Sequence, residues 1–210
     1  MEEWFDVLDE SGRPTGVKKL REQVHQDGDL HGASHMWVIG PIRKNGRFDV
    51  LLQRRSYNKD SHPDQLDTSS AGHVAAGETY LSTAVRELRE ELGLTVAECD
   101  LIPLYQYRME YTEEFHGALF HDNEIHQVYV LRNDFPLDTL TFQREEISEL
   151  MWMDNLELLR RLKAGDEELC IIPEEYELFL EAVKKLYQKN AAGEILPKLR
   201  ISPEETNHQC

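Results

Sequence analysis

The sequence predicts an α/β domain in which a mixed β-sheet carries helices on both faces. Short apolar runs with turn residues between them predict strands, one amphipathic helix interrupts these strands, and two more helices follow them. Elements of both kinds in this order favour a layered sheet. A chain of 210 residues can close one core, so we expect a single domain over residues 1–190 and a polar tail over residues 191–210.

The predicted strands are apolar or alternating runs that end at turn residues. They cover residues 4–8, 35–39, 48–53, 68–73, 101–111, 125–131 and 147–153. A turn is expected at residues 10–14, a hairpin at Asn45-Gly46, and irregular chain at residues 63–67. Gly117 and residues 121–123 are expected to form a loop before the strand at 125–131.

Three helices are predicted from apolar spacing and end signals. The first runs from Thr79 to Leu92 and ends at Gly93, and the second runs from Asn155 to Ala164 with Asp154 as its cap. The third begins at Pro173 and carries an apolar stripe. We expect this stripe to pack against the sheet, and the alternative is an exposed stripe that forms a homodimer.

The composition excludes several classes of partner. Forty acidic residues outweigh 23 basic ones, for a formal net charge of −17, so we expect no nucleic-acid polymer as a ligand. No apolar stretch approaches the roughly 18 residues of a membrane span, and the first residues do not resemble a signal peptide. The three cysteines are few and unpatterned, which fits a reducing compartment, so we expect a cytoplasmic protein.

Three glutamates on the first helix predict a metal site. Glu87, Glu90 and Glu91 are spaced i, i+3 and i+4, so a helix stacks them on one face, opposite an apolar stripe. Adjacent carboxylates repel one another unless a cation lies among them, and hard oxygen ligands suit Mg²⁺ or Mn²⁺. Arg86 lies beside Glu87 and can orient one carboxylate. The alternative is an ordinary solvated helix.

The segment from Gly72 to Leu94 decides between these interpretations. It fits the pattern G-x5-E-x7-R-E-U-x-E-E-x-G-U, where U is aliphatic, at every fixed position. This pattern is the Nudix box, so the chain resembles the Nudix hydrolases. The resemblance implies an α/β/α sandwich with a mixed sheet, here with additional C-terminal helices, and metal-dependent cleavage of a diphosphate. It also implies that the Gly72 carbonyl binds the metal with the three glutamates.

Segments beyond the box resemble the branch that includes isopentenyl diphosphate isomerase. These segments are DVLDESGRPTG, DLHGASHMWVI, LLQRRSYNKDSHPDQLDTSSAGH and DNEIHQVYV. The resemblance implies that Arg55 and Lys59 bind the substrate's diphosphate, which a guanidinium fork and an ammonium group can do. The isomerase has a cysteine just before the Gly-His pair, where this chain has Ala71, and an alanine cannot transfer a proton. We therefore expect hydrolysis rather than isomerisation.

A second metal site is implied by the same resemblance. The residues that match the isomerase's own metal site are His25, His31, His73, Asp122 and Glu124. The isomerase has a glutamate at the position of Asp122, so this ligand is shorter here. A histidine-rich site favours Mn²⁺, Zn²⁺ or another transition metal over Mg²⁺. The alternative is that the match is a coincidence, because the chain contains nine histidines. His35, for example, lies as near in the sequence to the matched position as His31 does.

The expected reaction is attack of water on a phosphorus atom of a small-molecule diphosphate. Glu124 is the first candidate for the proton acceptor, with Glu146 and Glu87 as alternatives. A nucleoside diphosphate derivative and a prenyl or other organic diphosphate fit the box equally, because the box contacts only phosphates and metal. Two further alternatives are an isomerase that uses a different acid and a non-catalytic module that binds a nucleotide.

Overall fold

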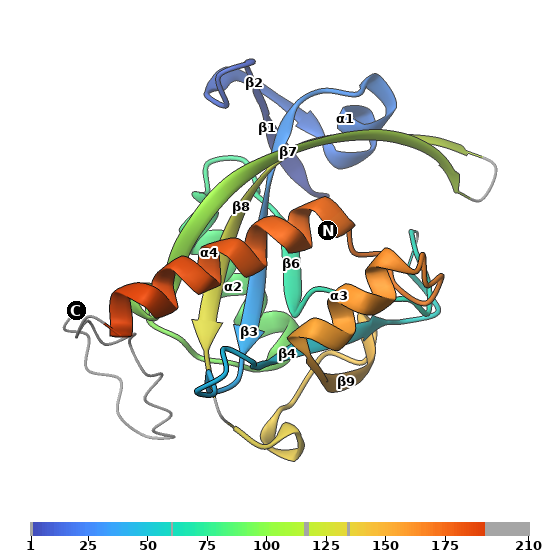
Figure 1. Cartoon of the computed structure of the whole chain (residues 1–210). Helices are drawn as coiled ribbons and strands as arrows, with labels where there is room; N and C mark the ends of the chain where they lie inside the picture. Colours follow the sequence, from blue (N-terminus) through green and yellow to red (C-terminus); the bar gives the residue numbers. More distant parts are fainter. Residues whose placement is uncertain (1, 60, 116–117, 134, 192–210) are drawn as a thin grey trace.

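The computed structural model describes residues 2–59, 61–115, 118–133 and 135–191 (Figure 1). Its strands and α-helices, in chain order, are β1 (Trp4–Leu8), β2 (Pro14–Leu20), α1 (Arg21–Asp27), β3 (His31–Ile39), β4 (Asp49–Arg55), β5 (Leu66–Asp67), β6 (Ser70–His73), α2 (Tyr80–Leu92), β7 (Ile102–Phe115), β8 (Ala118–Arg132), β9 (Ile147–Asp154), α3 (Asn155–Lys163) and α4 (Pro173–Ala191). Within these described ranges, no helix combines the length and the apolar character that crossing a bilayer requires.

A mixed seven-stranded sheet forms the middle layer. Its main strand order is β5-β4-β3-β8-β7, while β6 pairs with β3 and β9 pairs with β4. β3 and β8 run parallel, and the other pairs in this sheet run antiparallel. β1 and β2 form a separate two-stranded sheet that lies with α1 at the N-terminal end of β3 (Figure 1).

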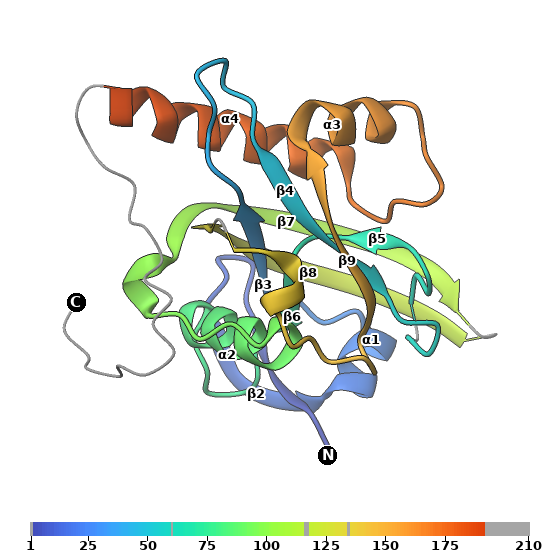
Figure 2. The ribbon, with the colours of Figure 1, turned by 90° about the horizontal axis from the view of Figure 1, so that it is seen from below.

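Alternating side chains of β3 contribute to a core on each face of the large sheet. Met36 and Val38 pack with residues of α2 such as Leu88, whereas Trp37 and Ile39 pack with residues of α3 and α4. This is the two-residue period of a strand that is buried on both faces. Figure 2 shows α2 on one side of the sheet and α3 and α4 on the other. The predicted α/β/α sandwich with additional C-terminal helices is confirmed.

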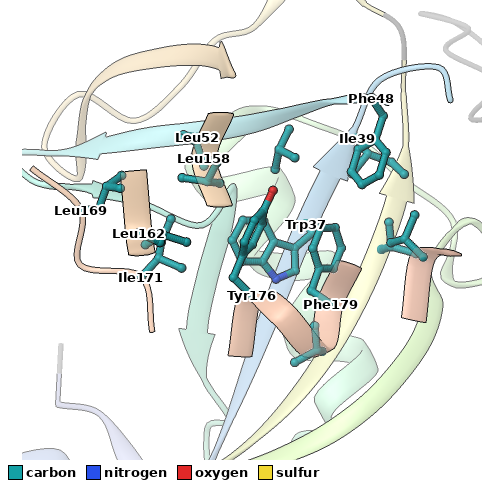
Figure 3. Packing of buried hydrophobic residues seen from close by; sticks show 14 of the residues in the cluster. Trp37, Ile39, Phe48, Leu52, Leu158, Leu162, Leu169, Ile171, Tyr176 and Phe179 are labelled. Carbon is teal, nitrogen blue, oxygen red and sulfur yellow. The ribbon is translucent and has the colours of Figure 1, made fainter. Parts of the chain in front are cut away.

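Aromatic side chains hold α4 on the sheet. The rings of Trp37 and Phe179 stack with centroids 4.8 Å apart, and Tyr176 lies 5.3 Å from Trp37 (Figure 3). The Tyr176 hydroxyl donates a 3.0 Å hydrogen bond to the backbone carbonyl of Asn155, at the start of α3. The apolar stripe of α4 therefore packs within the chain, as predicted, and is not the exposed stripe that the dimer alternative requires. The helix extends to Ala191, and the rest of the predicted tail lies outside the described residues.

Helix α2 begins and ends where the sequence predicts. The Thr79 side chain accepts a hydrogen bond from the Ser82 backbone N–H, and the Ser82 hydroxyl lies 3.0 Å from the Thr79 backbone nitrogen, which forms a capping box. Gly93 follows the last turn in a left-handed conformation with φ of 68°. A glycine adopts this conformation at little cost, so it ends the helix cleanly.

Several strand predictions are wrong in their extent. Residues 121–123 are expected in a loop, but they lie within β8, which pairs with β7 along its length. Residues 63–67 are expected to be irregular, but Leu66 and Asp67 form the short strand β5. No prediction corresponds to β2 or α1. The polar face of β8 lines a cavity instead of an apolar core, so hydrophobic alternation does not mark its first half. The loop expected at Gly117 lies outside the described residues.

Truncating Phe179 tests whether α4 is part of the core. Phe179→Ala should lower the free energy of unfolding by about 3–5 kcal/mol, because it leaves a cavity against Trp37. Leu178→Ala is the matched control, since Leu178 is 43% exposed, and it should change the stability by less than about 0.5 kcal/mol. Urea denaturation measures both variants. Equal small effects would contradict a shared core.

Candidate active site

A cavity of about 890 Å³ is bounded by α2, β6 and the β7–β8 hairpin. The loop after β4 and the first turn of α4 complete its walls. The predicted site residues in its lining are Arg55, Lys59, Gly72, His73, Arg86, Glu87, Glu90, Glu91, Asp122 and Glu124. His25 and His31 are buried next to Asp122. The fold thus brings the predicted residues of both metal sites to one place.

The absence of a side chain at Gly72 allows Glu87 to lie against β6. A Cβ atom at position 72 would overlap the Glu87 carboxylate. Arg86 Nη1 donates hydrogen bonds of 2.7 Å to Glu87 Oε1 and 3.2 Å to Glu90 Oε2. The Nε and Nη2 atoms of Arg86 donate to Glu78. The predicted contact between Arg86 and Glu87 is therefore present, and Glu78 anchors the other side of the guanidinium group.

The three box glutamates differ in burial. Ser70 Oγ donates a 2.6 Å hydrogen bond to Glu91 Oε2, and the Ala71 backbone N–H donates to the same oxygen at 3.3 Å. The Glu91 residue is 7% exposed, whereas the Glu90 side chain is 46% exposed. The Glu87 side chain is intermediate at 14%. The helix thus presents carboxylates from the floor of the cavity to its mouth.

Electrostatics at this stripe favour a bound cation. Burial raises the pKa of Glu91 to about 8, and the neighbouring Glu87 carboxylate adds to the rise. Burial also raises the pKa of Glu87, although Arg86 opposes this effect. Both shifts reflect negative charges packed together in a low dielectric, which a divalent cation relieves by displacing a proton.

Five residues from four elements form what we call the histidine cluster, namely His25, His31, His73, Asp122 and Glu124. His25 in α1, His31 in β3, His73 in β6 and Asp122 in β8 each place a ligand atom within 4.8 Å of the others. The parallel register of β3 and β8 pairs His31 with Glu124. Glu124 Oε1 lies 2.9 Å from His73 Nε2 and 3.2 Å from His31 Nε2. All five residues expected for the second metal site therefore meet.

Buried atoms of the histidine cluster fit a metal ion. Within the described structure, His25 Nε2 and Asp122 Oδ1 have no hydrogen-bond partner, and His31 Nε2 has none of good geometry, although it lies 3.2 Å from Glu124 Oε1. Each of the two nitrogens lies 3.7 Å from Asp122 Oδ1. Because buried polar atoms nearly always have a partner, three such atoms together point to a ligand. Imidazoles with carboxylates are donors that transition metals accept.

Two histidines of the cluster have the charge state that suits metal binding, whereas, although burial opposes this effect, Glu124 raises the pKa of the third, His31. Burial lowers the pKa of His25 to about 3 and the pKa of His73 to about 4, so both rings are neutral at pH 7, the form that ligates metals. Although burial acts in the opposite direction, His73 and His126 hold the pKa of Glu124 well below its usual range. Burial and the Glu124 charge raise the pKa of Asp122 to about 7.

Arg55 and Lys59 line the cavity, but each is also bonded to protein groups. Arg55 Nη1 donates a 2.9 Å hydrogen bond to Asp67 Oδ2, and its Nε and Nη2 atoms donate to the Ser61 carbonyl. Lys59 Nζ forms an ion pair with Glu146. Arg55 therefore holds the loop that carries Lys59. Their binding of a diphosphate stays a prediction.

Sequence patterns do not single out His126, which contacts Glu124 of the histidine cluster, or Glu175, which contacts His126. His126 follows Glu124 by two positions in β8, so strand alternation places both on one face, and this spacing is a usable signal. Glu175 lies in the first turn of α4, where the apolar stripe indicates only packing. Although burial opposes it, the carboxylates of Glu124 and Glu175 raise the pKa of His126 to about 10.

Comparison with known proteins decides the family. A profile of the NUDIX domain matches residues 33–172, which is about two thirds of the chain. The chain belongs to the Nudix family. An uncharacterised Nudix hydrolase from Clostridium acetobutylicum is 35% identical over 161 residues, which cover 77% of this chain and 74% of that protein.

Other relatives of this Nudix chain include a protein named as a Nudix hydrolase and one named as an isopentenyl-diphosphate isomerase, the two resemblances found in the sequence. Nudix hydrolase 3 from Arabidopsis thaliana is 41% identical over 154 residues, and the match covers 72% of this chain but 19% of that longer protein. An isopentenyl-diphosphate delta-isomerase from Saccharopolyspora erythraea is 32% identical over 149 residues, which cover 70% of each chain. The predicted Nudix resemblance is confirmed, and an isomerase is among the relatives.

A solved structure supports the same fold. A crystal structure from Deinococcus radiodurans matches with a TM-score of 0.63 at 23% identity, over 83% of this chain and 98% of that one. At this identity, the likeness shows the fold alone. The layers seen here therefore occur in another protein of limited sequence similarity.

Binding of Mg²⁺ should depend on pH through Glu91. Its pKa of about 8 lies above the ordinary value, so below pH 8 the ion must displace a proton, and affinity should fall roughly tenfold per pH unit on acidification. Calorimetry at pH 6.5 in two buffers of different ionisation enthalpy should show release of about one proton per ion. Glu91→Gln should abolish this release, and the exposed-site control Glu98→Gln should retain it. Affinity that does not change between pH 6.5 and pH 9 would contradict this role.

Proposed function

We propose that this Nudix hydrolase cleaves the diphosphate linkage of a small phosphorylated metabolite by attack of water on phosphorus. Mg²⁺ or Mn²⁺ would be held by Glu87, Glu90, Glu91 and the Gly72 carbonyl. The observation that carries this proposal is that three carboxylates of one helix face one cavity, where burial, together with the Glu87 charge, raises the pKa of Glu91, the most buried one. Bound divalent cations polarise phosphoryl oxygens and lower the pKa of bound water.

The protein holds these ligands in place through its own contacts. Arg86 bonds to Glu87 and Glu90, while Ser70 and the Ala71 backbone bond to Glu91. Carboxylates that are already oriented need little reorganisation during the reaction, which is how positioning and electrostatics lower a barrier. Arg55, at the end of β4, and Lys59, in the loop that follows, would then bind the phosphates.

Contacts around Glu124 bear on which group accepts the proton of the attacking water. Its Oε2 atom lies 2.7 Å from His126 Nε2, and its Oε1 atom lies 2.9 Å from His73 Nε2. A buried carboxylate with both oxygens occupied is poorly placed to take a proton from water in the cavity. In place of the sequence-based preference for Glu124, we propose Glu146, which lines the cavity and is bonded through one carboxylate oxygen to Lys59.

An isomerase is the second candidate, and the complete histidine cluster is the observation that favours it. Ala71 counts against it, because its methyl group cannot transfer a proton and its backbone N–H is bonded to Glu91. An isomerase would interconvert isopentenyl and dimethylallyl diphosphates without releasing a phosphate group. The non-catalytic alternative is disfavoured because every box carboxylate is present.

The cavity lining favours a polar organic group on the substrate. Arg108, Glu110 and Glu113 of β7 and His35 of β3 contribute to its walls. Hydroxyls and ring nitrogens of a nucleoside can bond to such side chains, whereas an isoprenoid chain cannot. A screen over dinucleotide polyphosphates, nucleotide sugars, coenzyme A and prenyl diphosphates tests this preference. Turnover confined to prenyl diphosphates would contradict it.

Removal of a box carboxylate should abolish most activity. Glu90→Gln and Glu91→Gln should each lower the kcat of metal-dependent diphosphate hydrolysis by roughly 100-fold or more, since each removes a charged oxygen ligand. Glu98→Gln lies at an exposed position outside the cavity lining and should stay within about twofold of the wild type. Phosphate release on the best substrate of the screen measures all three. Wild-type turnover in both box variants, with intact folding, would show that the ligands are misassigned.

A further inference from the structure

A second cluster, with two buried residues and one half-buried residue, lies beside the histidine cluster, toward α4. It consists of His35 in β3, His126 in β8 and Glu175 in the first turn of α4, whose ligand-type atoms lie within 4.8 Å of one another. The rings of His35 and His126 stack with centroids 3.8 Å apart. His126 and Glu175 are 1% and 3% exposed. Charged groups buried this deeply need partners, and here they find them in each other.

A continuous line of contacts joins Glu175 to the histidine cluster. Glu175 Oε1 lies 3.0 Å from His35 Nδ1, and Glu175 Oε2 lies 3.4 Å from His126 Nδ1. His126 Nε2 lies 2.7 Å from Glu124 Oε2. Both ring nitrogens of His126 therefore face carboxylate oxygens, one of Glu124 and one of Glu175. The ring links these two carboxylates and has no nitrogen left for a metal ion.

The two carboxylate oxygens of Glu124 have different surroundings as a result. Oε2 is occupied by His126, while Oε1 lies 2.9 Å from His73 Nε2 and 3.2 Å from His31 Nε2. A glutamate side chain has three rotatable torsions and can otherwise present either oxygen or both. A charge-assisted hydrogen bond to one oxygen removes that freedom.

We propose that Glu175 and His126 are positioning residues that fix the Glu124 carboxylate, so that only Oε1 faces a metal ion in the histidine cluster. The inference rests on the proposed function in one respect, namely that this cluster binds a metal ion. Groups that hold the far side of a metal ligand typically change metal affinity by roughly 10- to 100-fold when they are removed.

Helix α4 would then have a second role besides covering the sheet. Glu175 lies beyond the residues that match the NUDIX domain profile, which end at 172. The Tyr105 hydroxyl donates a 2.9 Å hydrogen bond to the Glu175 backbone carbonyl, and the Phe179 ring holds the next turn against Trp37. The same packing that covers the sheet therefore places a carboxylate where it supports the histidine cluster.

Titration of the chelator-treated, full-length protein with Co²⁺ tests the inference, because the visible absorption of bound Co²⁺ reports its ligand geometry. The wild type should show an absorption that His25→Ala removes. Glu175→Gln should weaken Co²⁺ binding by roughly 10- to 100-fold and alter the spectrum. Glu174→Gln makes the same charge change at the exposed neighbouring position and should match the wild type.

A second variant keeps the test decisive if Glu175→Gln fails to fold cooperatively. His126→Phe retains a ring but removes both nitrogens, so it should show the same loss. The double variant should lose no more than either single variant, because both act through one contact. Wild-type affinity and spectrum in the folded variants would overturn the inference alone. A wild type without His25-dependent Co²⁺ binding would overturn the inference and the metal site together.

Discussion

Close packing of α2 on β6 at Gly72 is the constraint on which the rest of the site depends. The Glu87 carboxylate fills the space that a side chain at position 72 would need. This approach brings Glu91 under Ser70 and Ala71, where burial raises its pKa to about 8. Mutual repulsion of the carboxylates is offset because the opposite, apolar face of the same helix is buried in the core. Packing of α2 on the sheet thus holds carboxylates close together although they repel one another.

The sheet places two kinds of donor in one cavity. Gly72 and His73 are neighbours in β6, so the site formed by the box glutamates and the Gly72 carbonyl lies next to the histidine cluster. The register of β3 with β8 sets His31 opposite Glu124. Carboxylates and carbonyls suit Mg²⁺ or Mn²⁺, whereas imidazoles suit transition metals, so we expect the two proposed sites to prefer different ions. The proposed hydrolysis requires the first site, and we propose that Glu175 of α4 supports the second through His126.

Regular local patterns made most of the fold and the acidic stripe predictable. Thr79 and Gly93 mark the two ends of α2, and they were predictable because the signals for helix ends act within a few residues. The shared face of its glutamates follows from their spacing and from helix geometry. The first half of β8 escaped prediction because residues such as Asp122 face a cavity, which removes the apolar alternation. The contact between His126 and Glu175 joins residues 49 positions apart in the sequence and depends on how α4 packs, so no local pattern predicts it.

Anomalous diffraction from crystals soaked in Mn²⁺ tests the central claim most directly, because it locates ions without reference to turnover. We expect one peak bounded by the carboxylates of Glu87, Glu90 and Glu91, and a second peak within the histidine cluster. A soaked crystal with no ion at the three glutamates, and with Arg86 still bonded to Glu87 and Glu90, would contradict the claim.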